Sequence, residues 1–286
     1  MTASTAKDDL RTPPPGPGRT MKAVVKAAAG PGVEIRDVPV PAPGPGELLL
    51  RVLRAGICGT DLHIYEWDDW SRNRIRPPVV IGHEFVGEIV GLGEGVSEFR
   101  TGERVSFESH IVCGYCTACR TGAAHVCTNT RILGVDVNGG FAEYAVAPAV
   151  NAWRAPANVP LEVQSVMEPL GNAVHTAFAG DLSACRIAVT GCGPIGLFAI
   201  AVARAAGAAQ VIAADVVPYR LELARKMRAD AVIDSAQEDF VARVAELTEG
   251  RGLDGVLEMS GNARAIRDGL AALRNGGRLS LLGLPR

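Results

Sequence analysis

The part of the chain that begins at Arg186 constrains the fold most strongly, because strand-like and helix-like segments alternate there. Apolar runs of strand length recur between longer runs that suit helices. The expected strands are residues 186–190, 210–214, 231–233, 254–258 and 278–282, and the expected helices are residues 195–206, 219–227, 238–249 and 263–273. Parallel neighbours in a sheet must be joined by crossovers, so this alternation predicts an α/β fold with a doubly wound parallel sheet.

The first turn of this series carries Gly191, Gly193 and Gly196 in a G-x-G-x-x-G pattern between a strand and a helix. Asp215 ends the next strand, 19 residues after Gly196. This context predicts a dinucleotide site, with the pyrophosphate at the helix N-terminus and the ribose hydroxyls on Asp215. Asp215 would repel a 2′-phosphate, which favours NAD over NADP. A plain strand-to-helix turn is the alternative.

The two ends of the chain carry further expectations. The chain ends directly after the fifth expected strand, so a missing sixth strand would leave apolar residues 279–282 at a sheet edge. We therefore expect a sequence that is shortened at its C-terminus. Residues 1–20 are proline-rich and contain no apolar signal segment, which predicts a disordered extension and a cytoplasmic location. The formal net charge of −2 and the lack of long apolar runs argue against nucleic-acid and membrane partners.

Residues 21–165 have a different texture, in which short apolar runs are cut by glycine and proline. A first strand is expected at residues 21–25. Further strand candidates are residues 33–38, 47–55, 85–92, 104–107 and 141–147. Many short strands with intervening turns predict a β-rich, barrel-like domain over residues 21–165, followed by the α/β domain over residues 166–286.

Four of the seven cysteines lie within fifteen residues, at Cys113, Cys116, Cys119 and Cys127. Without a signal peptide, metal binding is favoured over disulfides. Four thiolates can close a tetrahedron around Zn²⁺ with no open position, so the pattern predicts a structural zinc site. An iron–sulfur cluster is the alternative, but the last gap is seven residues and no proline follows Cys127.

A second set of possible metal ligands comprises Cys58 and His83, with an oxygen from Glu84 or Glu168. Taken alone, these residues also fit a buried cysteine, a core histidine and surface acids. Together with a nucleotide site, they predict hydride transfer at a carbon whose oxygen is polarised by catalytic zinc. Thr60 and His63 follow Cys58 closely and are candidates for carrying the proton to solvent.

Several segments resemble a known family. They are residues 57–65, 67–68, 70–71, 82–84, 169–177, 219–227 and 257–261. With them, residues 21–286 resemble the zinc-dependent medium-chain dehydrogenases, whose first domain is GroES-like and whose second is a Rossmann domain. The similarity is greatest to the branch that oxidises L-threonine. Trp67-Asp68 and Trp70-Ser71 are among its most specific residues, although packing is an alternative role for both tryptophans.

The resemblance implies roles for individual residues. It places Cys58, His83 and Glu84 on a catalytic zinc, with Glu168 as a fourth ligand or a group behind the ligands. It places Thr60 and His63 in the proton relay, and the four clustered cysteines on a structural zinc. It also implies the NAD contacts, which are Ile195, Asp215, Arg220, Leu282, Gly283 and Leu284. It gives no role to His110.

The implied reaction is oxidation of the C3 hydroxyl of L-threonine to 2-amino-3-oxobutanoate with reduction of NAD⁺. A polyol or other secondary-alcohol dehydrogenase of the same family is the first alternative. An inactive remnant that still binds zinc and NAD is the second. The full-length chain is expected to form a homotetramer.

Overall fold

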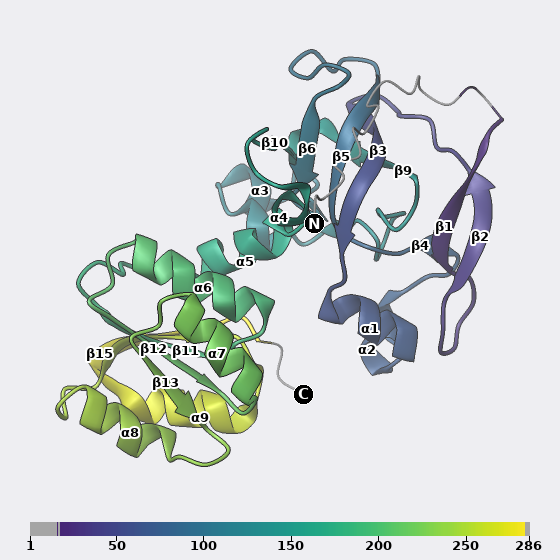
Figure 1. Ribbon diagram of the computed structural model, residues 1–286. Coiled ribbons are helices and arrows are strands. Elements are labelled where there is room, and N and C mark those ends of the chain that lie inside the picture. Colours follow the sequence, from purple (N-terminus) through teal and green to yellow (C-terminus); the bar gives the residue numbers. More distant parts are fainter. Residues whose placement is uncertain (1–15, 17, 284–286) are drawn as a thin grey trace, which may run out of the picture. The chain divides into compact units, whose positions relative to one another are not determined.

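The computed structural model describes residue 16 and residues 18–283. It contains two compact units that meet between Glu168 and Pro169, both drawn in Figure 1. Apart from residues 16 and 18–20, the extension expected over residues 1–20 lies outside the described residues. Among the helices described, none is long and apolar enough to cross a membrane.

The first unit is built on two antiparallel sheets, with strand orders β2-β1-β4 and β10-β6-β5-β3-β9. Their strands are β1 (Thr20–Lys26), β2 (Glu34–Pro39), β3 (Glu47–Gly56), β4 (Val79–Val80), β5 (Glu84–Leu92), β6 (Arg104–Phe107), β9 (Tyr144–Pro148) and β10 (Ala152–Arg154). Leu48 and Leu50 on β3 pack with Phe85 and Ile89 on β5 in one core. The packing holds β3 against β5, the pair of strands that positions the candidate metal ligands.

Short elements connect these strands. They are α1 (Gly59–Glu66), α2 (Asp69–Arg74), β7 (His110–Ile111), α3 (Thr117–Arg120), η1 (Ala124–Val126), β8 (Arg131–Ile132), η2 (Ala149–Asn151) and α4 (Leu161–Gln164). β7 and β8 pair with each other and frame the loop that carries the four clustered cysteines. Helices α1 and α2 were not predicted from the sequence.

The strand expected at residues 141–147 begins later, at Tyr144, because Phe141 bonds to two other segments. The Phe141 N–H donates to the Ile81 carbonyl at 2.9 Å, and the Phe141 carbonyl accepts from the Val24 N–H at 2.8 Å. Phe141 therefore bonds to β1 and to the residue after β4, and the ladder with β3 begins only at Tyr144.

The second unit has one parallel sheet with the order β13-β12-β11-β14-β15, which confirms the doubly wound arrangement expected from the sequence. The strands are β11 (Arg186–Thr190), β12 (Gln210–Asp215), β13 (Ala231–Asp234), β14 (Leu253–Glu258) and β15 (Leu273–Leu281). The helices are α5 (Met167–Ala177), α6 (Pro194–Ala205), α7 (Pro218–Lys226), α8 (Phe240–Leu247) and α9 (Ala263–Ala272).

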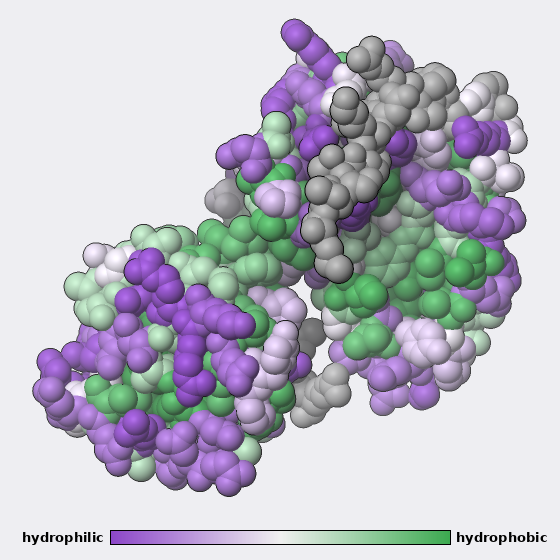
Figure 2. Space-filling model, viewed as in Figure 1, coloured by the Kyte–Doolittle hydropathy of each residue, from purple (hydrophilic) through white to green (hydrophobic). Residues whose placement is uncertain are grey.

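Helices cover both faces of this sheet. One core cluster includes side chains of α5, α6 and α7, and another includes side chains of α8 and α9. Strand β12 is buried along almost its whole length, as a parallel strand covered on both faces must be. Figure 2 shows hydrophilic and hydrophobic residues interspersed on the visible face of this unit.

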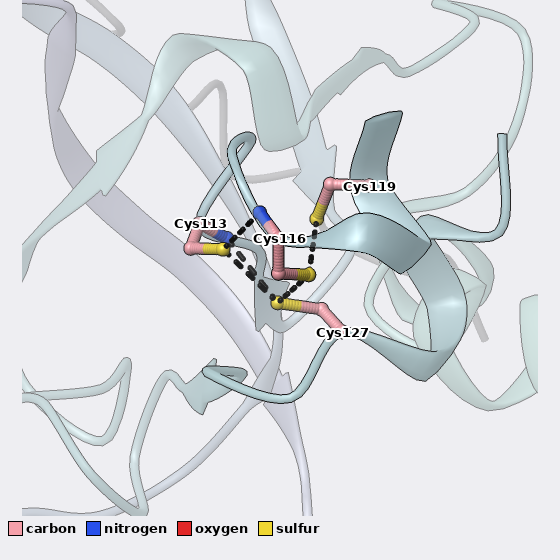
Figure 3. Close-up of side chains that lie close together, drawn as sticks. All are labelled: Cys113, Cys116, Cys119 and Cys127. Atoms are coloured by element: carbon pink, nitrogen blue, oxygen red, sulfur yellow. Dashed lines mark hydrogen bonds between the residues drawn. The ribbon is translucent and has the colours of Figure 1, made fainter. Parts of the chain in front are cut away.

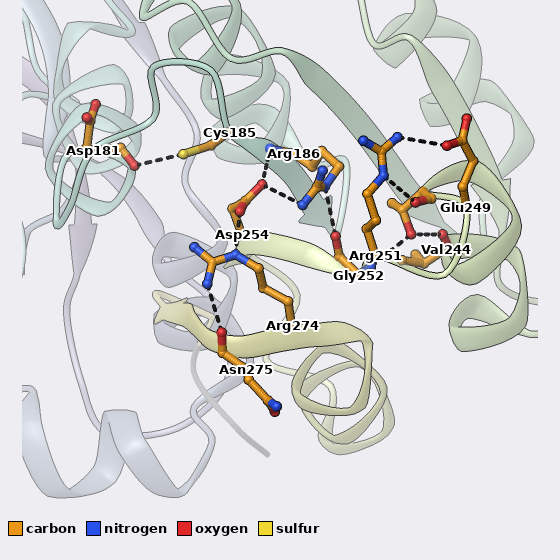
Figure 4. Close-up of polar contacts among 11 residues, drawn as sticks. Asp181, Cys185, Arg186, Val244, Glu249, Arg251, Gly252, Asp254, Arg274 and Asn275 are labelled. Atoms are coloured by element: carbon orange, nitrogen blue, oxygen red, sulfur yellow. Dashed lines mark hydrogen bonds and ion pairs between the residues drawn. The ribbon is translucent and has the colours of Figure 1, made fainter.

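Charged side chains hold the strands together at the edge where they begin (Figure 4). The Arg186 N–H on β11 and the Arg274 Nε on β15 donate to the two oxygens of Asp254 on β14, at 2.7 and 2.6 Å. Strand β15 begins five residues before the expected Arg278, at Leu273. The ladder shifts register between Leu253 and Gly255, where residues 274–277 bulge out.

Candidate metal centres and cofactor site

The antiparallel ladder between β3 and β5 brings together three candidate ligands that are distant in sequence. It pairs Gly56 with Glu84, so Cys58, just past the end of β3, lies beside His83 and Glu84 at the start of β5. One ligand atom from each of Cys58, His83 and Glu84 lies within 4.8 Å of the others. The structure therefore gathers a sulfur, a nitrogen and an oxygen at one point.

Gly82 makes the turn that leads into these ligands. Its φ is +92°, in the region that favours glycine. A side chain there would also come within 2.3 Å of the Phe141 ring. Any other residue here would strain the backbone and push against the Phe141 ring.

Burial shifts all three candidate ligands toward their neutral forms. It raises the pKa of Cys58 to about 11, and together with the charge of Glu168 it raises the pKa of Glu84 to about 7. Burial also lowers the pKa of His83 to about 4. A bound dication would favour the thiolate, the neutral imidazole and the carboxylate, which are the forms that coordinate zinc. This mixed donor set fits zinc.

Asp61 is a residue of this centre that sequence reasoning missed. Its Oδ1 lies 3.8 Å from the Nδ1 of His83, and both atoms are buried without a hydrogen-bond partner. Its Oδ2 accepts from the Cys58 N–H at 2.9 Å, and burial raises its pKa to about 6. When a carboxylate accepts a hydrogen bond from one imidazole nitrogen, the other nitrogen can coordinate a metal. The spacing from Cys58 to Asp61, which forms a capping box at the start of α1, was the available signal.

Thr60 and His63 lie on α1, immediately after Cys58. The Thr60 Oγ1 is 3.7 Å from the Cys58 Sγ. Residues three apart share one face of a helix, so Thr60 and His63 lie on the same side of α1. The Nδ1 of His63 is 2.6 Å from the Oδ2 of Asp68.

Glu168 belongs to a neighbouring group rather than to the Cys58 group. It is buried and accepts a hydrogen bond from the Ser109 Oγ at 2.8 Å. A carboxylate oxygen of Glu168 lies within 4.8 Å of ligand atoms of Glu108 and His110. Its hydrogen bond to the Glu108 carboxylate raises the pKa of His110. His110 thus lies beside the candidate centre, a position that depends on the fold and had no signal in the sequence.

The four clustered cysteines converge as Figure 3 shows. Their sulfurs lie 3.5 Å apart for Cys116 and Cys119, 3.8 Å for Cys116 and Cys127, and 3.6 Å for Cys113 and Cys127. Ligands about 2.3 Å from a common zinc would lie about 3.8 Å apart in a tetrahedron, so the geometry fits a Cys₄ zinc site. A hydrogen bond from Asn129 lowers the pKa of Cys113, which favours the thiolate.

The glycine turn between β11 and α6 borders a cavity of about 460 Å³. A side chain on Gly196 would come within 1.9 Å of the Gly191 carbonyl, so the turn and the helix touch there. No atom lies within 4 Å of the position where a side chain on Gly193 would begin. This open space at a helix N-terminus fits a pyrophosphate.

Asp215 closes the far end of the same cavity. It accepts from the Cys192 N–H at 2.7 Å through Oδ2 and from the Val217 N–H at 2.9 Å through Oδ1. Arg220 lies 3.8 Å from the Oδ2 of Asp215 and also lines the cavity. Each carboxylate oxygen keeps a lone pair that a ribose hydroxyl can use.

Known proteins share both units. Residues 44–157 match the family described as alcohol dehydrogenase GroES-like domain, and residues 194–286 match zinc-binding dehydrogenase. An L-threonine 3-dehydrogenase of Symbiobacterium thermophilum is 52% identical over 266 residues, which span 93% of this chain and 76% of the relative. This chain belongs to the zinc-binding dehydrogenase family. The fold class expected from the sequence is thereby confirmed.

Two solved structures place the dehydrogenase among proteins that hold nicotinamide cofactors. A protein of Sinorhizobium meliloti 1021 described as a zinc-binding dehydrogenase, bound to NADP, has a TM-score of 0.88 and 33% identity, with 93% of this chain and 78% of that chain covered. A short chain alcohol dehydrogenase (rspB) of Escherichia coli CFT073, complexed with NADH, has a TM-score of 0.83 and 34% identity, with 92% and 76% covered. The two cofactors differ, so the choice between them must come from this chain's own residues.

The remaining predicted NAD contacts are spread around the turn. Ile195 lies in the first turn of α6 and packs against the core of the second unit. The N–H groups of Leu282 and Gly283 donate to the Glu258 carbonyl at 2.9 and 3.1 Å, which joins the end of β15 to β14. Of the described residues, these three are not among those that line the cavity. Leu284 lies outside the described residues.

Proposed function

We propose that this dehydrogenase oxidises the C3 hydroxyl of L-threonine to 2-amino-3-oxobutanoate, with NAD⁺ as the hydride acceptor. The observation that carries the proposal is the meeting of Cys58, His83 and Glu84 within 4.8 Å, in a chain 52% identical to an L-threonine 3-dehydrogenase. Residues 21–165 would form the catalytic domain and residues 166–286 the NAD domain.

Cys58, His83 and Glu84 would hold the catalytic zinc, with Glu168 as a fourth ligand or a group behind the others. Zinc at this position supplies a Lewis acid that lowers the pKa of the substrate hydroxyl. Asp61, whose Oδ1 lies 3.8 Å from the His83 Nδ1, would orient the His83 ring. The four clustered cysteines would hold a second zinc that stabilises their loop and takes no part in the reaction.

The proton of the substrate hydroxyl leaves through the side chains that follow Cys58 on α1. The Thr60 hydroxyl, beside the Cys58 sulfur, can accept one hydrogen bond and donate the next. The side chain of His63 is 29% exposed, so it can pass a proton to solvent. Together they give the proton a path out of a centre whose other groups are buried.

NAD⁺ supplies the hydride acceptor. The turn of Gly191, Gly193 and Gly196 would receive its pyrophosphate, and Asp215 its adenosine ribose. Ile195, Arg220, Leu282, Gly283 and Leu284 would complete the contacts. Asp215 supports NAD over NADP because its carboxylate would repel a 2′-phosphate. The nearby Arg220 is already paired with that carboxylate.

We further propose a cytoplasmic homotetramer with no nucleic-acid or membrane partner. All seven cysteines carry free thiols, which suits a reducing compartment. The stated resemblance supports the tetramer, which sedimentation equilibrium can measure.

The proposed substrate is tested by comparing initial rates of NADH formation with L-threonine, 2,3-butanediol and sorbitol. We expect the highest kcat/KM with L-threonine. A higher value for either polyol would replace the proposal with a polyol dehydrogenase. No activity with any of the three, in protein that holds zinc and binds NAD⁺, would favour the inactive remnant.

A further inference from the structure

The segment from Trp67 to Ser71 follows α1 directly and turns back onto His63. The Trp67 N–H and the Ser71 Oγ both donate to the His63 carbonyl, at 2.9 and 2.7 Å. The Trp70 ring meets the His63 ring edge-on, with centroids 6.4 Å apart and planes at 62°. The Asp68 carboxylate contacts the imidazole Nδ1 at 2.6 Å. Four residues of one short segment therefore hold both the backbone and the ring of His63.

Asp68 uses its two oxygens for different partners. Its Oδ1 accepts from the Ser71 N–H at 2.9 Å and caps the start of α2, while its Oδ2 faces His63. The cap fixes the plane of the carboxylate and with it the position of Oδ2. The hydrogen bond from Ser71 is also the main cause that lowers the pKa of Asp68, so the carboxylate is ionised at neutral pH.

An ionised carboxylate can only accept hydrogen bonds. The Nδ1 of His63 must therefore carry the hydrogen in the 2.6 Å contact with Asp68. In a neutral imidazole this leaves Nε2 without a hydrogen and able to accept a proton.

The segment is itself held in place by Lys26, which contacts Trp67. Trp67 adopts a φ of 59°, which is unfavourable for a bulky residue. The ammonium of Lys26 lies 4.6 Å from the centre of the Trp67 ring, an attractive cation–π arrangement. Lys26 is fully buried and donates to the carbonyls of Gly30 and, at 2.8 Å, Gly32. These contacts hold Trp67 in the conformation that brings Asp68 to His63.

We propose that Trp67, Asp68, Trp70 and Ser71 form a clamp that holds His63 in the Nδ1–H tautomer, so that Nε2 is the nitrogen that takes up the relayed proton. Asp68 is the positioning residue of this clamp and contacts no reacting atom. The tautomer rests on the 2.6 Å contact between the Asp68 carboxylate and Nδ1, whereas its importance for turnover rests on the proposed relay role of His63.

The tautomer can be measured without substrate or turnover. In zinc-loaded protein labelled with ¹⁵N-histidine, two-bond ¹⁵N–¹H spectra distinguish Nδ1–H from Nε2–H. The chain has five histidines, so the spectrum of a His63→Gln variant assigns the signals of His63. At a pH of about 8.5, where ordinary imidazoles are neutral, we expect Nδ1–H in the wild type. An Nε2–H pattern in the wild type would overturn the proposal by itself.

Asp68→Asn tests the carboxylate with little change of shape. Asparagine caps helices as well as aspartate does, so its oxygen can keep the Ser71 N–H while its NH₂ faces His63. That group donates, so it should switch His63 to the Nε2–H tautomer. Asp69→Asn is the matched control, because the neighbouring Asp69 side chain is 92% exposed and pairs with Arg72. If Asp68→Asn leaves the tautomer unchanged, the proposal is wrong.

Measurements of kcat then test the relay role of His63 separately from its tautomer. We expect Asp68→Asn to lower kcat about 10²-fold, the scale of a lost general base, with KM for L-threonine changed less than about twofold. Asp68→Ser keeps a capping oxygen and frees the imidazole, so a smaller loss of about tenfold is expected. A switched tautomer with unchanged kcat would leave the clamp standing and refute the relay role of His63.

Discussion

Replacing Gly196 or Gly193 of the glycine turn by alanine should have different effects. The first change should lower stability, and the second should lower the affinity for NAD⁺ without lowering stability. A methyl group on Gly196 would lie 1.9 Å from the Gly191 carbonyl oxygen, more than 1 Å inside ordinary contact, so α6 must move away from the turn. Overpacking of this kind costs about 1–3 kcal/mol, which corresponds to a fall in Tm of roughly 4–12 °C in a unit of this size. Gly196→Ala should therefore weaken NAD⁺ binding indirectly, because it displaces the helix whose N-terminus faces the pyrophosphate site.

Gly193→Ala is the counterpart, because no atom lies within 4 Å of the added methyl. Its Tm should stay within about 1 °C of the wild type, since surface changes away from strained sites cost little. The methyl would instead occupy the space proposed for the pyrophosphate and raise the Kd for NAD⁺ about tenfold or more. Differential scanning fluorimetry and calorimetric titration with NAD⁺ measure the two effects. Wild-type affinity in Gly193→Ala would refute the assigned pyrophosphate position, and an unchanged Tm in Gly196→Ala would refute the close approach.

Three further predictions concern the ligands of zinc and NAD. Asp61→Asn should raise the Kd for the catalytic zinc about 10- to 100-fold in competition with a chelator, as expected for a group that orients a metal-bound imidazole; an unchanged Kd contradicts this role. When the cysteine loop already holds zinc, binding of a second zinc should release protons and tighten as pH rises. Glu84 should contribute up to its pKa of about 7 and Cys58 up to its pKa of about 11. Calorimetry in buffers of different ionisation enthalpy measures this release, and its absence would exclude both ligands. Asp215→Asn should lower kcat/KM for NAD⁺ about 10- to 100-fold and narrow the preference over NADP⁺, whereas an unaltered ratio argues against a ribose contact.

The second unit could be predicted closely because its signals are local. Apolar strands alternate with helices there, and β11 spans the expected residues 186–190. Helices α1 and α2 were missed because they are short and their ends are set by contacts outside local propensity. The Cys58 N-cap of α1, for example, is held by the Asp61 carboxylate, and α1 ends at Trp67 in a left-handed conformation.

In the candidate site, too, some residues could be predicted from local sequence and others could not. The cysteine loop is visible in the sequence because all four sulfurs come from one short segment. Cys58 and His83 are 25 residues apart, so their meeting depends on the pairing of β3 with β5. His110 was missed because only the fold supplies its neighbours. The capping-box spacing of Asp61 was visible in the sequence, but its approach to His83 was not. Trp67 and Trp70 were recognised as specific, but their contact with His63 was not foreseen.

Cys58, His83 and Glu84 are proposed to hold a zinc ion distinct from the zinc of the cysteine loop. Anomalous diffraction at the zinc absorption edge, from crystals of zinc-loaded protein, tests this claim most directly. We predict two peaks in each chain, one among the four clustered cysteines and one among Cys58, His83 and Glu84. Cys58→Ser should remove the second peak and keep the first. A single peak in the cysteine loop of fully loaded wild-type protein would contradict the claim.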